Sequence, residues 1–196
     1  ATREPIENVY VRKVEKIESK TKLDNVAGAN WVKIIIDRDK PKRVFIDVGG
    51  QGAGVYDLLN SWGYGFDPSK PDDRKMVVVP IDFGGSPQEP DIMLPSGELR
   101  PGPYNRRAEM WMRSRDWLDE PGGAQIPDQD SLQADACAPG YHYNANSYLL
   151  IESKEHMRDV RKVRSPDEWD AVALTFAEPV GETYVAPPPR KMNWVV

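Results

Sequence analysis

The chain has 196 residues, of which 39% are hydrophobic and 29% are charged, with a net charge of −5 at neutral pH. This length suits one domain with its own core, and the even mixture of residue classes is typical of a globular protein. The acidic balance argues against a protein that coats nucleic acid, although an enzyme can still contact DNA through a local basic face. The sequence has no apolar run near the roughly 20 residues that span a bilayer and no signal-peptide core at its start, which predicts an intracellular protein without membrane contact.

Cysteine and histidine are scarce, since the chain has one cysteine, Cys137, and two histidines, His142 and His156. A single cysteine excludes an internal disulfide framework and fits a reducing compartment. The same scarcity makes a zinc site a poor fit. A metal bound by this chain would be held by carboxylates, which favours magnesium or manganese.

Strands and helices are expected to alternate in the first half of the chain, which predicts an α/β fold. The expected elements are a strand at 8–17, a helix at 23–37, a strand at 44–47, a helix at 55–62 and a strand at 76–81. The strands at 44–47 and 76–81 are short apolar runs, a pattern typical of central strands covered on both faces.

The second half begins with a proline- and glycine-rich segment over 84–103, which is expected to form a long surface loop. A helix at 105–118, a strand at 148–151 and a last helix from 165 to about 177 follow, and residues 179–196 are expected to be an extended tail. For the last helix, Ser165 is predicted as the N-cap and Pro166 as the first helical residue.

Asp47 ends the predicted strand 44–47, and the glycine-rich turn Gly49-Gly50-Gln51-Gly52-Ala53-Gly54 follows it. Open α/β sheets place ligand sites at the carboxyl ends of their strands, so Asp47 is a candidate metal ligand. The alternative is that Asp47 only bonds amides of the turn. A dinucleotide fingerprint does not fit, because no register of these glycines matches G-x-G-x-x-G.

Asp167 and Asp170 lie three residues apart at the start of the last helix, and therefore on one helical face. Two acids on one face repel each other, and a divalent cation bound to both would relieve the repulsion. The alternative for Asp167 is a simple role at the helix start, where aspartate is common.

Four segments, VFIDVGGQGAG, NRRAEMW, LLIESKEHMR and SPDEWDAVALTFAEP, occur in this order in the chain. Together they resemble the C-terminal nuclease domain of phage terminase large subunits, over roughly residues 23–178. The resemblance implies a ribonuclease H-like α/β fold over 1–178, in which helices flank a central mixed sheet. It also implies a carboxylate cluster that holds two Mg²⁺ or Mn²⁺ ions.

The resemblance further assigns roles to individual residues. Asp47, Asp167 and Asp170 would be the catalytic metal ligands, with Asp170 either a ligand or a support for one. Residues that would contact DNA or support the ligands are Lys154, Arg106, Arg164, Gly49 and Gly50. Lys154 is otherwise an exposed lysine at a helix start. Arg106, Arg107 and Glu109 match the NRRAEMW helix and are expected mainly to pack or to face DNA, with a solvated helix face as the alternative for Arg107.

The function implied is cleavage of concatemeric double-stranded viral DNA by two-metal phosphodiester hydrolysis in the cytoplasm of a bacterial host. Its partners would be DNA, the terminase ATPase domain, the small terminase subunit and the portal. A basic rim before the last helix, formed by Arg158, Arg161, Lys162 and Arg164, is expected either to face phosphates or to be a solvated charge run.

The chain departs from the family in one respect, because residues 1–20 contain no aspartate where the family carries its first catalytic acid. The domain is therefore expected to lack its first strand, and the ATPase motif G-x-x-x-x-G-K-[ST] is also missing. Two alternatives follow: a catalytically incomplete module that binds DNA or the portal, and a Holliday-junction-type resolvase.

Overall fold

The structure is a computed structural model, and it describes residues 14, 23–70, 73, 75–120 and 124–180. The strand expected at 8–17 and most of the tail expected at 179–196 lie outside these residues. Among the described residues, no helix is both long enough and apolar enough to cross a membrane.

One half of the molecule follows the predicted α/β order. Helix α1 (Asn25–Asp39) packs against α2 (Gln51–Ser61), and α2 lies on the strands β1 (Val44–Asp47) and β2 (Val78–Ile81). The two strands are parallel, and their register pairs Asp47 with Ile81. The buried core between these elements consists of Ala29, Ile36, Leu59, Tyr64, Val77 and Val78.

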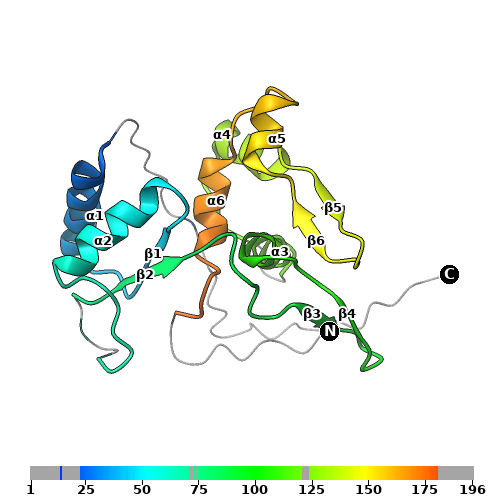
Figure 1. Cartoon of the computed structure of the whole chain (residues 1–196), viewed down its shortest axis with the longest axis horizontal. Coiled ribbons are helices and arrows are strands. Elements are labelled where there is room, and N and C mark those ends of the chain that lie inside the picture. Colours follow the sequence, from blue (N-terminus) through cyan, green and yellow to red (C-terminus); the bar gives the residue numbers. More distant parts are fainter. Residues whose placement is uncertain (1–13, 15–22, 71–72, 74, 121–123, 181–196) are drawn as a thin grey trace, which may run out of the picture.

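Helix α6 (Asp167–Leu174) stands in the middle of the molecule, between this half and the remaining elements (Figure 1). It packs against α3 (Arg106–Leu118) and α4 (Asp130–Cys137). Its contacts bury a second core that includes Met110, Trp111, Trp117, Leu132 and Trp169, together with Val79 and Ile81 from β2. Because β2 contributes to both cores, the strand end with Asp47 and the start of α6 are held next to each other.

Two hairpins complete the described fold. Strands β3 (Asp91–Met93) and β4 (Leu99–Pro101) are antiparallel, which corrects the expectation of an unstructured loop over 84–103. The hairpin forms because Gly97, with a φ of 83°, reverses the chain and donates its N–H to the Leu94 carbonyl. Strands β5 (Tyr141–Tyr143) and β6 (Leu149–Ile151) form the second hairpin, and α5 (Lys154–Asp159) follows it.

The strands are paired only two by two in the part of the chain that the structure describes. The parallel β1–β2 pair with its helices agrees with an α/β fold. The central mixed sheet is not shown by these residues, and with the strand expected at 8–17 outside them it stays a prediction.

The start of α6 differs from the predicted cap. Pro166, not Ser165, is the N-cap residue, and no side-chain cap bond comes from it. The Ser165 hydroxyl instead donates to Asp167 Oδ1 at 2.7 Å. The acceptor for the helix start comes from α4, where Asp135 Oδ2 accepts the Glu168 N–H at 2.9 Å. A residue remote in sequence therefore supplies the bond that the local pattern assigned to Ser165.

Candidate active site

A small cavity of about 180 Å³ brings the predicted acidic residues together. Its lining residues are Asp47, Phe83, Lys154, Asp167, Asp170, Ala171 and Leu174. They come from the end of β1, the segment after β2, the start of α5 and one face of α6. Acids that are more than 100 residues apart in sequence thus face one space.

The turn after β1 orients Asp47. Its Oδ1 accepts the Gly49 N–H at 2.9 Å, so the turn bond of the alternative reading is present while the carboxylate also lines the cavity. Gly50 has a φ of 65°, a left-handed conformation that favours glycine. A Cβ at Gly52 would lie 1.8 Å from the Asp47 carbonyl oxygen, so only glycine lets α2 start this close to the strand end.

The ammonium of Lys154 lies between the two acids of α6. Its Nζ is 3.0 Å from Asp167 Oδ1 and 2.9 Å from Asp170 Oδ2. Burial disfavours the charged lysine, but the carboxylates of Asp170 and Asp167 together outweigh burial and raise the pKa of Lys154. Burial likewise opposes the charge of Asp167, and hydrogen bonds from Ser165 and Lys154 outweigh it and lower its pKa. The Lys154 ammonium is therefore the cation that compensates the charge of these two carboxylates.

Asp170 is buried and held from behind by α3. Its Oδ1 accepts the Arg107 Nε–H at 3.0 Å and the Trp111 indole N–H at 2.7 Å. The other nitrogen groups of Arg107 bond Asp170 Oδ2 at 3.5 Å and the Glu152 carbonyl at 2.8 Å. Arg107 is only 8% exposed, so the alternative of a solvated helix face is wrong: a buried carboxylate needs its charge compensated in the interior.

Three other arginines singled out in the sequence are paired with acids of the protein. Arg106 is 6% exposed, bonds Glu109 at 2.6 Å and also donates to the Ala177 carbonyl, so it braces α3 and the end of α6 away from solvent. This geometry agrees with the packing role expected for Arg106 in the NRRAEMW helix. Arg164 pairs with Asp135 at 2.6 Å, and Arg161 pairs with Glu152 at 2.5 Å. The predicted rim is therefore partly neutralised by these acids.

The sequence interpretation missed Arg107 and Trp111 as parts of the site. They lie four residues apart on α3 and so share a face, a signal that was available. It also missed Asp82, which follows β2 as Asp47 ends β1. In the turn after β1 the Gly49 N–H donates to Asp47, and in the turn after β2 the Gly84 N–H donates to Asp82. Because β1 and β2 are parallel, this repeated Asp-x-Gly pattern places both acids at one sheet edge.

The donor chemistry of the cavity suits a hard divalent cation, because its polar lining consists of carboxylates and one ammonium. Lys154 compensates Asp167 and Asp170, which marks the position where positive charge is required. Across the described ranges, no three acidic, histidine or cysteine side chains stand close enough together to form a ready metal cluster. Binding would therefore need Lys154 and the carboxylates to rearrange.

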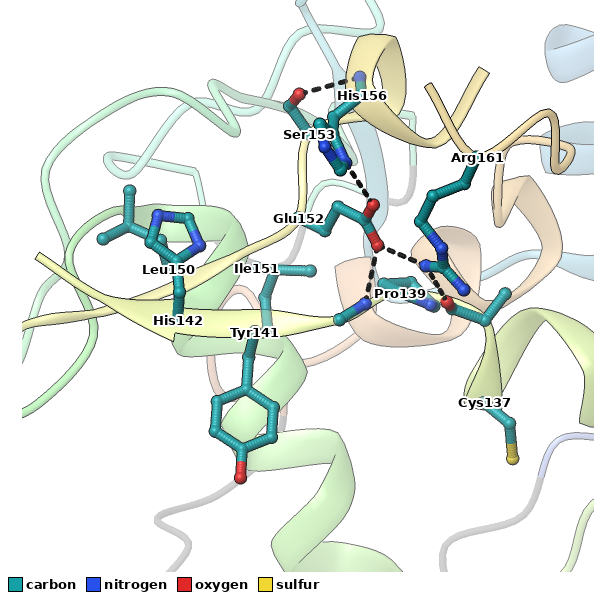
Figure 2. Close-up of a pocket in the computed structure, with 12 residues that line it drawn as sticks. Cys137, Pro139, Tyr141, His142, Leu150, Ile151, Glu152, Ser153, His156 and Arg161 are labelled. Carbon is teal, nitrogen blue, oxygen red and sulfur yellow. Dashed lines mark hydrogen bonds and ion pairs between the residues drawn. The ribbon is translucent and has the colours of Figure 1, made fainter. Parts of the chain in front are cut away.

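A larger cavity of about 730 Å³ lies beside the β5–β6 hairpin and contains none of the predicted ligands (Figure 2). At its centre the Glu152 carboxylate accepts the Gly140 N–H at 2.8 Å and an Arg161 N–H at 2.5 Å, and His156 Nδ1 lies 2.5 Å from it. The Gly140 N–H, followed by His156 and Arg161, lowers the pKa of Glu152 to about 2. The Glu152 carboxylate of the larger cavity is fully paired, so the smaller cavity is the better candidate for chemistry.

No protein-family model matches this sequence, and no curated protein matches it. Solved structures do. The nuclease domain of the large terminase subunit gp2 of bacterial virus Sf6 aligns with a TM-score of 0.59 and 17% identity over 78% of this chain and 72% of that chain. A mutant of that domain with manganese and beta-thujaplicinol aligns with a TM-score of 0.61 and 15% identity over 81% and 75% of the two chains.

A further structure of the same viral protein, a mutant with calcium, aligns with a TM-score of 0.58 and 17% identity over 78% of this chain and 72% of that chain. The chain has the fold of a phage large-terminase nuclease domain. The resemblance indicated by the four sequence motifs is thereby confirmed at the level of fold.

Proposed function

We propose that this chain is a metal-dependent nuclease domain of a phage DNA-packaging terminase, with a ribonuclease H-like fold. The observation that carries the proposal is the cavity in which Asp47 from β1 meets Asp167 and Asp170 from α6. The fold shared with a viral terminase nuclease supports it, and so do the manganese and calcium in structures of that protein.

In this proposal Asp47, Asp167 and Asp170 hold Mg²⁺ or Mn²⁺. A pair of such ions would supply stabilisation of the negative charge that develops during hydrolysis of a phosphodiester bond. Asp47 is aimed by the Gly49 N–H, and Asp170 presents Oδ2 to the cavity while Oδ1 is anchored on α3. The side-chain exposure of 74% at Asp167 leaves it the most accessible of the three.

Lys154 has the position to act on the substrate. Its side chain is 39% exposed and lines the cavity, so its ammonium can turn from the acids of α6 toward a phosphate of the backbone. Contacts of this kind do not depend on base sequence and weaken with salt. The natural substrate would be double-stranded viral DNA in the host cytoplasm, with the ATPase domain, the small subunit and the portal as partners.

The test is cleavage of supercoiled plasmid by the purified chain with Mn²⁺, with Mg²⁺, and with EDTA. We expect cleavage that needs the metal and falls about 100-fold or more in Asp47→Asn, Asp167→Asn and Asp170→Asn, because each removes charge that stabilises the transition state. Asp57→Asn, on the exposed face of α2, is the matched control and should cleave like the wild type.

The proposal would be contradicted if the wild-type chain showed no metal-dependent cleavage. It would also be contradicted if the three cavity variants cleaved as fast as the wild type. A four-way junction and a linear duplex are included as substrates. Preferential cleavage of the junction would favour a Holliday-junction-type resolvase over a terminase nuclease. DNA binding with no cleavage in any metal would favour the catalytically incomplete module, which the lack of a ready three-acid cluster in the described part supports.

A further inference from the structure

Helix α3 presents two hydrogen-bond donors side by side to the buried acid of the cavity. Arg107 and Trp111 are one helical turn apart, and both donate to Asp170 Oδ1, at 3.0 and 2.7 Å. The Arg107 guanidinium also lies 5.6 Å from the centre of the Trp111 ring, so each side chain supports the other. Two donors on one oxygen fix the rotation of the carboxylate.

The same guanidinium reaches the segment that carries the cavity's lysine. Arg107 Nη1 donates to the Glu152 carbonyl at 2.8 Å, two residues before Lys154. One side chain therefore ties the acid of α6 to the strand end from which α5 and its lysine begin. The distance between Asp170 Oδ2 and Lys154 Nζ, 2.9 Å, is thus set by groups that do not line the cavity.

Burial makes this network rigid. Arg107 is 8% exposed, Trp111 8% and Asp170 4%, so water competes little for these hydrogen bonds. Groups that hydrogen-bond a metal-binding carboxylate from behind fix its orientation, and their loss typically weakens metal binding by about 10- to 100-fold.

We infer that Arg107 and Trp111 are positioning residues that hold the Asp170 carboxylate with Oδ2 toward the cavity, and that they set the divalent-ion affinity of the site. The inference rests on the proposed function for its link to metal binding. It gives Arg107 and Trp111 of α3 a role in the site beyond packing and DNA contact.

Calorimetry with MnCl₂ on the full chain tests this inference. Arg107→Lys keeps the charge but loses the planar fork, and Trp111→Phe keeps the ring but loses the N–H donor. We expect the Kd for Mn²⁺ to rise about 10-fold or more in each. Trp117→Phe is the matched control, since Trp117 lies in the same helix, is 3% exposed and packs on Phe176, with no bond to Asp170 among those described. It should bind Mn²⁺ like the wild type.

A readout without metal separates this inference from the proposed function. The indole N–H resonance of Trp111, assigned through Trp111→Phe, should shift in Asp170→Asn and stay unchanged in Asp57→Asn. If the wild type binds no Mn²⁺, the proposed function fails, and an unshifted resonance overturns the positioning role as well. If the wild type binds Mn²⁺ but the Arg107 and Trp111 variants match Trp117→Phe within twofold, the inference is overturned while the proposed function stands.

Discussion

Single charged residues in the interior of this protein are paired with partners far away in sequence. Asp170 is held by Arg107, 63 residues away, and Asp135 by Arg164, 29 residues away. Because a buried unpaired charge is strongly unfavourable, each pair fixes how the elements that carry it dock. Glu152 at the larger cavity is paired over a shorter range, with the Gly140 amide, His156 and Arg161.

Glu152 makes the stability of the folded protein depend on pH in the acidic range. Its pKa is about 2 in the folded chain against an ordinary 4.5, so the folded state binds fewer protons than the unfolded state between these values. Its contribution is fully present above pH 4.5 and is lost as the pH falls toward 2. We expect Glu152→Gln to lower the melting temperature at pH 6 and to reduce the further fall between pH 4.5 and pH 2.

Melting curves from pH 6 to pH 2 check this prediction. Glu98→Gln, at an exposed position before β4, is the control and should follow the wild type at every pH. Parallel curves for Glu152→Gln and the wild type throughout this range would mean that Glu152 has no depressed pKa.

Whole elements are brought together at the site by a few close backbone approaches. The start of α2 touches the end of β1 because Gly52 has no Cβ, and α6 begins where Asp135 of α4 accepts its N–H. The sequence pattern predicted β1 with its bounds, whereas α2 begins at Gln51 and not at 55, and α6 covers Asp167–Leu174 and not 165–177. It did not predict β3–β4, because prolines and glycines resemble loop residues until the pairing across Gly97 is known.

The close contact between Gly52 of α2 and the end of β1 leads to a prediction about how these elements pack. We expect Gly52→Ala to lower the free energy of unfolding by about 3 kcal/mol and to abolish metal binding, because its Cβ would meet backbone and not a flexible side chain. Gly84→Ala, in the equivalent turn after β2, meets only Asp82 Oδ1 at 3.4 Å and should change the stability by less than about 0.5 kcal/mol. Urea unfolding of both variants is the measurement, and equal midpoints would contradict this view of the turn.

Across the whole molecule, the cavity lies where the end of β1 meets the start of α5 and one face of α6. The sequence predicted the acids because they follow a buried strand and start a helix, which are local signals. It did not predict the bonds from Arg107 and Trp111 to Asp170, because nothing local shows which face of α3 meets α6.

Anomalous diffraction from crystals of the chain soaked in MnCl₂ tests the central claim, that the acids of β1 and α6 together bind a divalent ion. We predict a manganese peak in the cavity within coordination distance of Asp47 and of an acid of α6, with the Lys154 ammonium moved away from its place between Asp167 and Asp170. Crystals that show no manganese in the cavity, with the ammonium still bridging the two α6 acids, would contradict it.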